Sequence, residues 1–250
     1  MLEYSNLRKE PSMSVAKITR DFIENFEDGK IFTINDIPSC KKSSVIIELS
    51  RLFKKGLINK VSKGKYYKPK KRAFGQIGPS SDDKISKYLD NAEGVSYETG
   101  SNSFRQLGLT TQISKTTTIA TNKPYRKVQI DNINIKFVPK RVDVKTKDIH
   151  LLQILDALKD IKKIPATTPS LAYVYLKSII EKESTENQFK LTKYAKKYTP
   201  RTKALLGAIL KELGNNECAY ELKDSLNVLT TFKLGISSDI IKDKKYWNIV

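Results

Sequence analysis

The stretch that most limits the fold lies between residues 43 and 69, where a helical pattern gives way to two short strands. Apolar residues recur at helical spacing from Ser43 to Lys55, and Gly56 supplies the left-handed residue that often ends a helix. The segments LINKV and KYYKP then follow on either side of SKG, whose glycine suits a tight turn. The sequence therefore predicts a helix followed directly by a two-stranded hairpin.

Two further elements are predicted before this helix. From Ser12 to the stop at Asp28-Gly29, four apolar residues recur at helical spacing: Val15, Ile18, Phe22 and Phe26. The segment KIFTINDIP then gives a short extended piece, in which Thr33 can cap a single turn that Pro38 ends. The order helix, short helix, helix, hairpin is typical of a winged helix-turn-helix domain.

The segment KKRAFGQIGPSSDD, rich in Gly and Pro, is typical of a linker between domains. After a helix near 82–91, the segments TTTIATN and KVQIDNINIKFVP indicate strands, and from Ile149 the apolar pattern becomes helical. We therefore predict an α+β protein. Its predicted parts are a winged helix-turn-helix domain over 1–72, a linker over 73–81, and a mixed α/β domain with a helical C-terminal end over 82–250.

The charge balance favours a nucleic-acid partner. The 250 residues include 46 Lys and Arg against 27 Asp and Glu, which gives a formal net charge of +19. A coding bias toward A and T would raise Glu together with Lys, so it does not account for this imbalance. A functional need for positive charge accounts for the imbalance, and binding of nucleic acid is the commonest reason for such a need. An acidic protein partner and an anionic membrane surface are the alternatives.

The helix predicted from Ser43 to Lys55 has two distinct faces. Five apolar residues are expected to pack on the first helix: Val45, Ile46, Leu49, Leu52 and Phe53. On the opposite face, Arg51 can bind a guanine edge and Ile47 a thymine methyl group, while hydroxyls and lysines can contact phosphates. With the helix entrance and the wing included, the candidate residues for binding double-stranded DNA are Lys41, Lys42, Ser43, Ser44, Ile47, Arg51, Lys54, Lys60, Ser62, Lys63 and Lys65.

A second group of cations occurs near the C-terminus. It comprises Lys190, Lys193, Lys196, Lys197, Arg201 and Lys203. A solvated helix face is the simpler interpretation, and the alternatives are an extension of the DNA-binding surface or a contact with an acidic partner. The nearby aromatic residues Tyr194, Tyr198 and Trp247 are predicted to belong to the core or its edge rather than to stack on bases.

Nothing in the sequence indicates an enzyme, a cofactor or a metal site. The single histidine, His150, begins an apolar helix and has no recognisable catalytic partner. Phosphate-binding glycine motifs are absent, and Asp131, Asp143 and Asp148 have the setting of solvated loop acids. The two cysteines, Cys40 and Cys218, have no partners at metal-ligand spacing and form no disulfide framework.

The N-terminus does not resemble a signal peptide, and no apolar run is long enough to span a membrane. We therefore expect a cytoplasmic protein that has no membrane partner.

Four segments, in order, carry a resemblance to a known family: the wing segment LFKKGLINKVSKGKYYKP, then GSNSFRQLGLTTQ with TIATNKPYRKVQIDNINIKFVPKR, then YTPRTKALLGAILKELG, and finally LKDSLNVLTTFKLGI closing on WNIV. Together they resemble the AbiEi antitoxin family of abortive-infection, type IV toxin–antitoxin systems, which act in phage defence. The resemblance implies an N-terminal winged helix that represses its own promoter and a C-terminal domain that counteracts a toxin. The toxin of that family is a nucleotidyltransferase encoded beside the antitoxin, and neutralisation is thought to need no stable complex.

The family-like positions are Gly100, Leu107, Gly108, Leu109, Thr110, Thr111, Gln112, Ala120, Thr121, Asn122 and Pro124. We expect most of them to be structural, with Gly108 ending a helix and Asn122-Lys123-Pro124 forming a turn. A transcriptional regulator or plasmid-maintenance protein that acts alone is the main alternative, with a C-terminal domain that oligomerises or senses a ligand.

Overall fold

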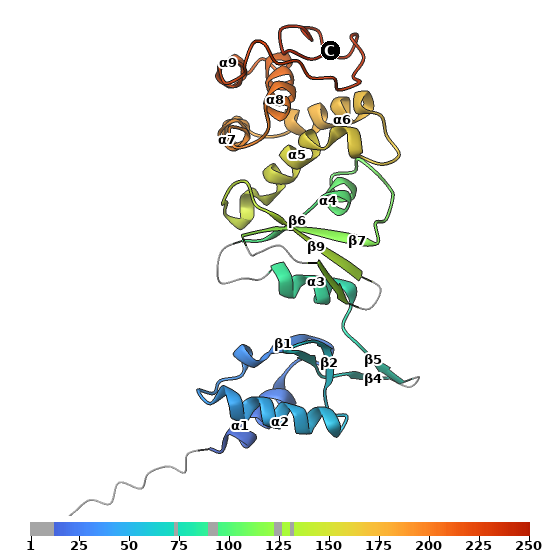
Figure 1. The fold of residues 1–250 in the computed structure, drawn as a ribbon, viewed down its shortest axis with the longest axis vertical. Coiled ribbons are helices and arrows are strands. Elements are labelled where there is room, and N and C mark those ends of the chain that lie inside the picture. The colour runs from blue at the N-terminus through green and yellow to red at the C-terminus, as the bar shows by residue number, and fades with distance from the viewer. Residues whose placement is uncertain (1–12, 73–74, 90–94, 123–126, 131–132) are drawn as a thin grey trace, which may run out of the picture. The chain divides into compact units, whose positions relative to one another are not determined.

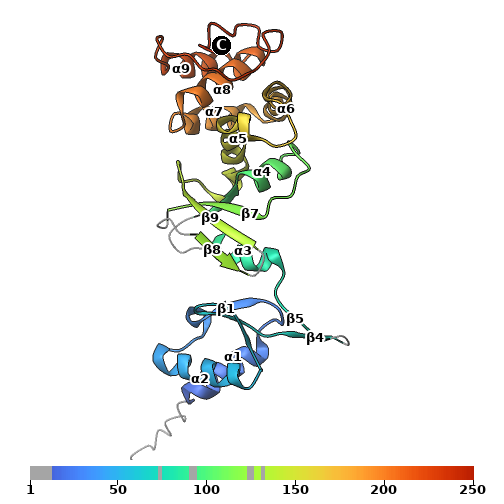
Figure 2. The same cartoon turned by 45° about the vertical axis from the view of Figure 1, so that its right-hand side comes forward.

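The computed structural model describes residues 13–72, 75–89, 95–122, 127–130 and 133–250. Over these residues the protein combines helices with small sheets, which confirms the predicted α+β class. The chain divides into two compact units, residues 1–87 and 88–250 (Figures 1 and 2).

The first unit packs two helices against a small sheet. Helix α1 (Val15–Asn25) begins where the Ser14 hydroxyl accepts the backbone N–H of Lys17 at 3.3 Å. The elements that follow are β1 (Ile31–Thr33), the 3-10 turn η1 (Ile34–Asp36), α2 (Lys42–Lys54), β2 (Asn59–Ser62) and β3 (Lys65–Tyr67). The three strands form an antiparallel sheet in the order β1-β3-β2, so the C-terminal hairpin pairs with the strand that follows α1.

Two glycines produce the predicted change from helix to hairpin. The backbone N–H of Gly56, whose φ is +70°, donates to the Phe53 carbonyl at 2.9 Å. The next N–H, of Leu57, donates to the Leu52 carbonyl at 3.1 Å, which completes a Schellman motif at the end of α2. Gly64, with φ +76°, lies in the turn between β2 and β3. Both conformations favour glycine because a side chain would strain the backbone.

The core of the first unit differs from the predicted one on α2. Val45, Leu49 and Leu52 are buried as expected, but Ile46 and Phe53 are 47% and 45% exposed, and the predicted packing of these two residues is wrong. Glu48 is buried in their place. Val45, Leu49 and Leu52 form the middle of the packed face of α2. Ile46 and Phe53 lie at the sides of this face and are therefore exposed. The remaining members of this core are Ile23, Phe32, Ile37, Ile58 and Tyr66.

The segment predicted as a linker contains regular structure. Strand β4 (Lys70–Arg72) pairs with β5 (Gly75–Ile77) in an antiparallel hairpin, and helix α3 (Ser81–Leu89) begins within the predicted linker range 73–81. Gly and Pro were interpreted as loop residues, yet Gly75 adopts φ +120° inside a short strand. The division between the compact units falls later than predicted, between residues 87 and 88.

The second unit is built on a four-stranded sheet in the order β6-β7-β9-β8. Its strands are β6 (Tyr97–Thr99), β7 (Thr116–Thr121), β8 (Lys127–Ile130) and β9 (Ile133–Pro139). The two central strands, β7 and β9, are parallel, and each edge strand is antiparallel to its neighbour. Helix α4 (Ser101–Gln106) connects β6 to β7 and ends at Gly108, which has φ +78° and confirms the predicted helix stop. The predicted turn at residues 122–124 and Asp131 lie partly or wholly outside the described residues.

Five helices lie to one side of this sheet and enclose the main core (Figures 1 and 2). They are α5 (Ile149–Lys159), α6 (Pro169–Glu181), α7 (Thr185–Ala195), α8 (Pro200–Glu212) and α9 (Asn216–Asp224), with the 3-10 turns η2 (Thr146–Asp148) and η3 (Ile161–Lys163) around α5. The helical pattern predicted from Ile149 onward is confirmed. Within the described residues, no helix has the length and apolar character needed to cross a membrane.

Candidate nucleic-acid interface

The outer face of α2 presents hydroxyl, basic and apolar side chains to solvent. Ser43, Ile47 and Lys54 are exposed, and Arg51 has a side chain that is 67% exposed. Ser44 is half-buried at the edge of this face. Ser50 is also exposed and was not among the predicted DNA-binding residues. It lies seven residues after Ser43, a spacing that places both hydroxyls on one helix face.

Arg51 is held in place by a buried carboxylate. Its Nη1 lies 3.4 Å from Oε2 of Glu48, whose side chain is 3% exposed. The other carboxylate oxygen, Oε1, accepts a hydrogen bond from Nε of Arg20 on α1 at 2.7 Å. This bond to Arg20 is the main cause that holds the pKa of Glu48 below its usual value, against the opposing effect of burial. One acid therefore links α1 to α2 and orients the exposed guanidinium group.

We predict that Arg20→Ala lowers the free energy of unfolding of the first unit by about 1–3 kcal/mol at pH 7, because it leaves a buried carboxylate poorly paired. Because the pKa of Glu48 is lower in the folded protein than its usual value of 4.5, the ionised carboxylate stabilises the fold at any pH above 4.5. This stabilisation is lost as the pH falls through the pKa of the folded state. The deficit of Arg20→Ala should therefore shrink in acid. Hydrogen exchange of the α2 amides measures it, with the exposed Lys17→Ala as a control of equal charge.

The turn between β2 and β3 adds a second set of basic residues. Lys60 and Lys63 are exposed, while Ser62 and Lys65 are half-buried. The register of the two strands shifts between Lys60 and Ser62, and this irregularity increases the local twist of the hairpin. The hairpin follows α2 directly in sequence, so its basic residues come soon after those of the outer face of α2.

The two lysines at the entrance of α2 have different environments. Lys41 is exposed. The ammonium group of Lys42 donates to the carbonyls of Ile34 and Ile37, each at 3.1 Å, and so binds to the end of the η1 turn. This assigns Lys42 a structural contact where the sequence analysis predicted a contact with phosphate.

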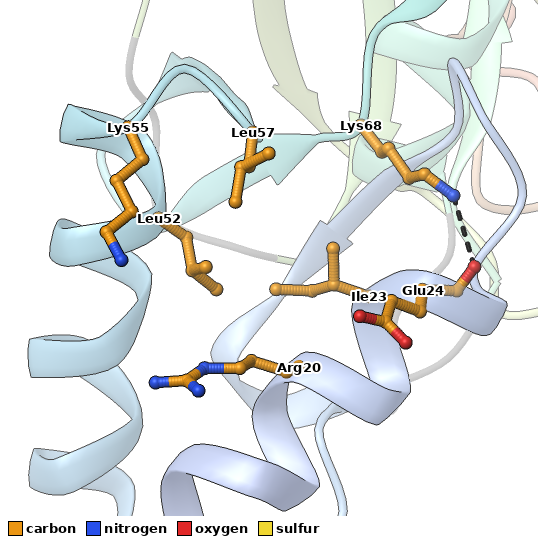
Figure 3. A pocket seen from close by; sticks show the side chains of 7 residues that line it. All are labelled: Arg20, Ile23, Glu24, Leu52, Lys55, Leu57 and Lys68. Carbon is orange, nitrogen blue, oxygen red and sulfur yellow. Dashed lines mark hydrogen bonds between the residues drawn. The ribbon is translucent and has the colours of Figure 1, made fainter.

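A pocket of about 320 Å³ opens between α1 and the end of α2 (Figure 3). Ile23, Leu52 and Leu57 form its apolar wall, with cations at the rim. One rim cation, Lys68, already donates to the Glu24 carbonyl at 3.1 Å and pairs with Asp28 at 2.8 Å. Helix α1 has no basic residue in its own last turn. Lys68 supplies the positive charge that stabilises this C-terminal end of the helix.

The second group of cations does not form one open basic surface. Lys190 pairs with Glu186 at 2.7 Å and with Asp148 at 3.5 Å. The other members differ in setting: Lys196 pairs with Glu221, Lys203 donates to the Ser225 carbonyl at 3.2 Å, Arg201 is half-buried, and Lys193 and Lys197 are exposed. A helical wheel of α7 alone could not reveal the acids that α9 and η2 bring to it.

Several residues that were considered for catalysis have structural positions. Asp148 is 6% exposed and accepts a hydrogen bond from Tyr194 at 3.1 Å, so its interpretation as a solvated loop acid is wrong. Asp143 is exposed and pairs with Lys140 at 2.7 Å. The His150 ring contacts the Lys147 carbonyl at 3.1 Å in the first turn of α5. Trp247 and Tyr198 are buried, as predicted.

The cysteines and acids that the structure describes were also considered as a possible site. Both cysteines are free, with Cys40 exposed and Cys218 buried. Among the described residues, no group of three or more His, Cys, Asp or Glu side chains could hold a metal ion.

Comparisons with known proteins give a family and a fold. The family DUF6088, described as a family of unknown function, matches residues 17–188, a segment that runs from α1 into α7. No curated protein matches the sequence. The chain is similar to the crystal structure of the RV2827C protein from Mycobacterium tuberculosis, with a TM-score of 0.52 and 10% identity over 94% of this chain and 89% of that one. At this identity the likeness concerns the fold alone, and it extends over both units.

Proposed function

We propose that this chain, which belongs to the DUF6088 family, binds double-stranded DNA through a winged helix-turn-helix domain at its N-terminus. The observation that carries the proposal is the outer face of α2, which is exposed along its length and continues into the basic β2–β3 turn. A helix of this kind fits the major groove, and a basic hairpin beside it fits the neighbouring phosphates. The formal net charge of +19 supports the same partner.

In this arrangement the side chains of α2 have separate roles. The hydroxyls of Ser43 and Ser50 fix the position of the helix on phosphates. Arg51 reads a guanine edge, and its contact with Glu48 limits the orientations that its guanidinium group can adopt before DNA binds. In the wing, Lys60 and Lys63 contribute charge without sequence information.

The test compares DNA binding by variants of the full chain over a range of salt concentrations. Lys63→Ala and Lys65→Ala should weaken binding to every sequence and reduce the slope of log affinity against log salt, which is about −0.9 per phosphate neutralised. Arg51→Ala should instead relax discrimination at one base step by roughly 1–3 kcal/mol. Lys17→Ala, on the exposed side of α1, is the matched control. An Arg51→Ala protein that binds with unchanged sequence preference would contradict this assignment of α2.

We further propose that the protein is a type IV antitoxin that represses its own promoter, and that the second unit counteracts a nucleotidyltransferase toxin. The support is the resemblance to the AbiEi family across both units. The structural roles of the family-like residues are compatible with it, since Gly100 precedes α4 with φ +72° and Leu109 packs in the core. Residues with structural roles of this kind do not locate the antitoxic surface of the second unit.

A further inference from the structure

One face of the sheet in the second unit carries an unusual row of polar side chains. Residues directly opposite each other on paired strands share a face. The pairs Thr99–Thr118, Thr118–Lys136 and Lys136–Lys127 therefore form a single row across all four strands. The next row, Tyr97–Ala120–Val138, joins the core beneath α5. The polar row thus lies at the edge of the face that α5 covers.

Two lysines occupy directly opposite positions in this row. Lys127 on β8 and Lys136 on β9 are a cross-strand pair, and both are exposed. Opposite residues in an antiparallel pair have Cβ atoms about 4.5–5.5 Å apart, so two ammonium groups there repel each other. Among the described residues, neither lysine has a carboxylate within ion-pair distance. An anion bound between them would remove the repulsion.

Three residues of the row, Thr99, Thr118 and Lys136, line a pocket of about 250 Å³ between the sheet and α5. Its inner wall is the buried carboxylate of Asp156. This group accepts hydrogen bonds from Thr99 at 2.7 Å and Tyr97 at 3.1 Å, and from Lys159 at 3.3 Å. These three donors satisfy the carboxylate of Asp156 within the protein, so a ligand does not have to supply a hydrogen-bond donor or a cation to it.

The second acid of the pocket is also neutralised internally. Asp160 lies 3.2 Å from Lys159 and 3.0 Å from Lys163. Burial raises the pKa of Asp160, but the two ammonium groups outweigh this effect and hold the pKa below its usual range. The two carboxylates of the pocket are therefore paired, and Lys136 and Arg141 are the other cations that line it.

Arg141 lines the pocket together with Lys136 and Lys159. Its guanidinium carbon lies 5.4 Å from the ring centroid of Tyr198, a contact that limits the motion of the side chain. Tyr198 is 5% exposed. Burial, together with the nearby carboxylate of Asp156, raises the pKa of Tyr198, so its ring is a neutral partner for the guanidinium group at neutral pH.

We propose that this pocket binds a phosphate-bearing ligand through Lys136 and Arg141, which line it, and that Lys127, opposite Lys136 on β8, adds positive charge beside it. Arginine binds phosphate with two parallel hydrogen bonds, and the paired lysines supply two further positive charges. A pocket of about 250 Å³ is smaller than sites for drug-sized molecules, so it holds one or two phosphate groups and leaves the rest of the ligand outside. The phosphates can come from a free nucleotide or from a nucleic-acid backbone.

The experiment measures binding of inorganic pyrophosphate, ADP and a short single-stranded oligonucleotide to the full chain by calorimetry. Lys136→Ala and Arg141→Ala should each weaken pyrophosphate binding by about tenfold to a hundredfold, the effect of one lost charged hydrogen bond. Lys145→Ala, an exposed lysine in the same connecting segment, should leave it unchanged. Tighter binding of ADP than of pyrophosphate identifies a nucleotide ligand. Tighter binding of the oligonucleotide, lost with Lys136→Ala, identifies a backbone ligand.

A thermal measurement separates this role from a structural one. The single tryptophan, Trp247, lies in the second unit, so its fluorescence reports the melting of that unit. Without ligand, Lys136→Ala should melt at the same temperature as the parent protein or higher, because it removes a like-charge pair. Pyrophosphate should raise the melting temperature of the parent and leave that of Lys136→Ala unchanged. The proposal is overturned if none of the three probes binds, or if Lys145→Ala weakens binding as much as Lys136→Ala does.

Discussion

Trp247→Ala should lower the free energy of unfolding of the second unit by about 3–5 kcal/mol, the usual loss for a large aromatic residue removed from a core. Trp247 is 1% exposed and anchors the C-terminal segment onto α8. Its ring lies directly over Gly207, where an added Cβ would be only 2.2 Å from Cζ3 of the indole. Glycine at position 207 is thus required by the packing of the ring and not by a turn.

Gly207→Ala tests this contact with the ring in place. Alanine is favoured over glycine inside a helix by about 1 kcal/mol, but displacing a packed ring costs about 1–3 kcal/mol or more. The substitution should therefore destabilise the parent protein. In the Trp247→Ala background the same substitution should stabilise, because the clash is gone and the helix preference remains.

Calorimetric melting of the four proteins measures this double-mutant cycle, with Leu229→Ala, at a side chain that is 88% exposed, as the control. If Gly207→Ala had the same sign in both backgrounds, the indole ring would not be the reason for the glycine.

The elements that the sequence predicted well are those fixed by local chemistry. Gly56 and Gly64 adopt positive φ, and the strands and helices they separate lie within a few residues of their predicted bounds. The hairpin of β8 and β9 follows from its β-branched alternation in the same way. In each case the determining atoms are neighbours in sequence.

The predictions that failed depended on partners distant in sequence. Burial of Glu48 depends on Arg20, which lies on another helix, so the wheel of α2 placed Ile46 and Phe53 in the core instead. The interpretation of Asp148 as a solvated loop acid failed for the same reason, because Tyr194 and Lys190, which contact it, lie more than 40 residues away in sequence.

The polar row of the second unit could not be predicted for a related reason. The β8–β9 hairpin brings Lys127 opposite Lys136. The rest of the row depends on the parallel pairing of β7 with β9, which brings Thr118 opposite Lys136, and the sequence between these two strands does not specify that register. Predicted DNA-binding residues were easier to find because helix α2 and its hairpin are contiguous in sequence.

A fragment that begins at Ser80 should lose operator binding by roughly a thousandfold or more, the usual ratio of specific to non-specific affinity, and should still counteract the cognate toxin. The cut preserves α3, because the Ser80 hydroxyl accepts the Asp83 backbone N–H at 3.1 Å and caps this helix. It removes the Lys30–Asp83 ion pair, which at 3.7 Å between partly exposed groups contributes little. Promoter repression and rescue of cells that express a nucleotidyltransferase toxin from the neighbouring gene are the two measurements.

The full chain carrying Lys63→Ala and Lys65→Ala provides the matched control, since it keeps every residue of the second unit. It should behave like the fragment, with weaker repression and normal rescue, because the proposed function assigns the charges of the first unit to DNA binding and antitoxicity to the second unit. Circular dichroism and the fluorescence of Trp247 confirm that the fragment is folded at matched expression. A folded fragment that gives no rescue would contradict the assignment of antitoxicity to the second unit. It would favour a regulator that acts alone, in which the second unit serves oligomerisation or the binding of a small ligand.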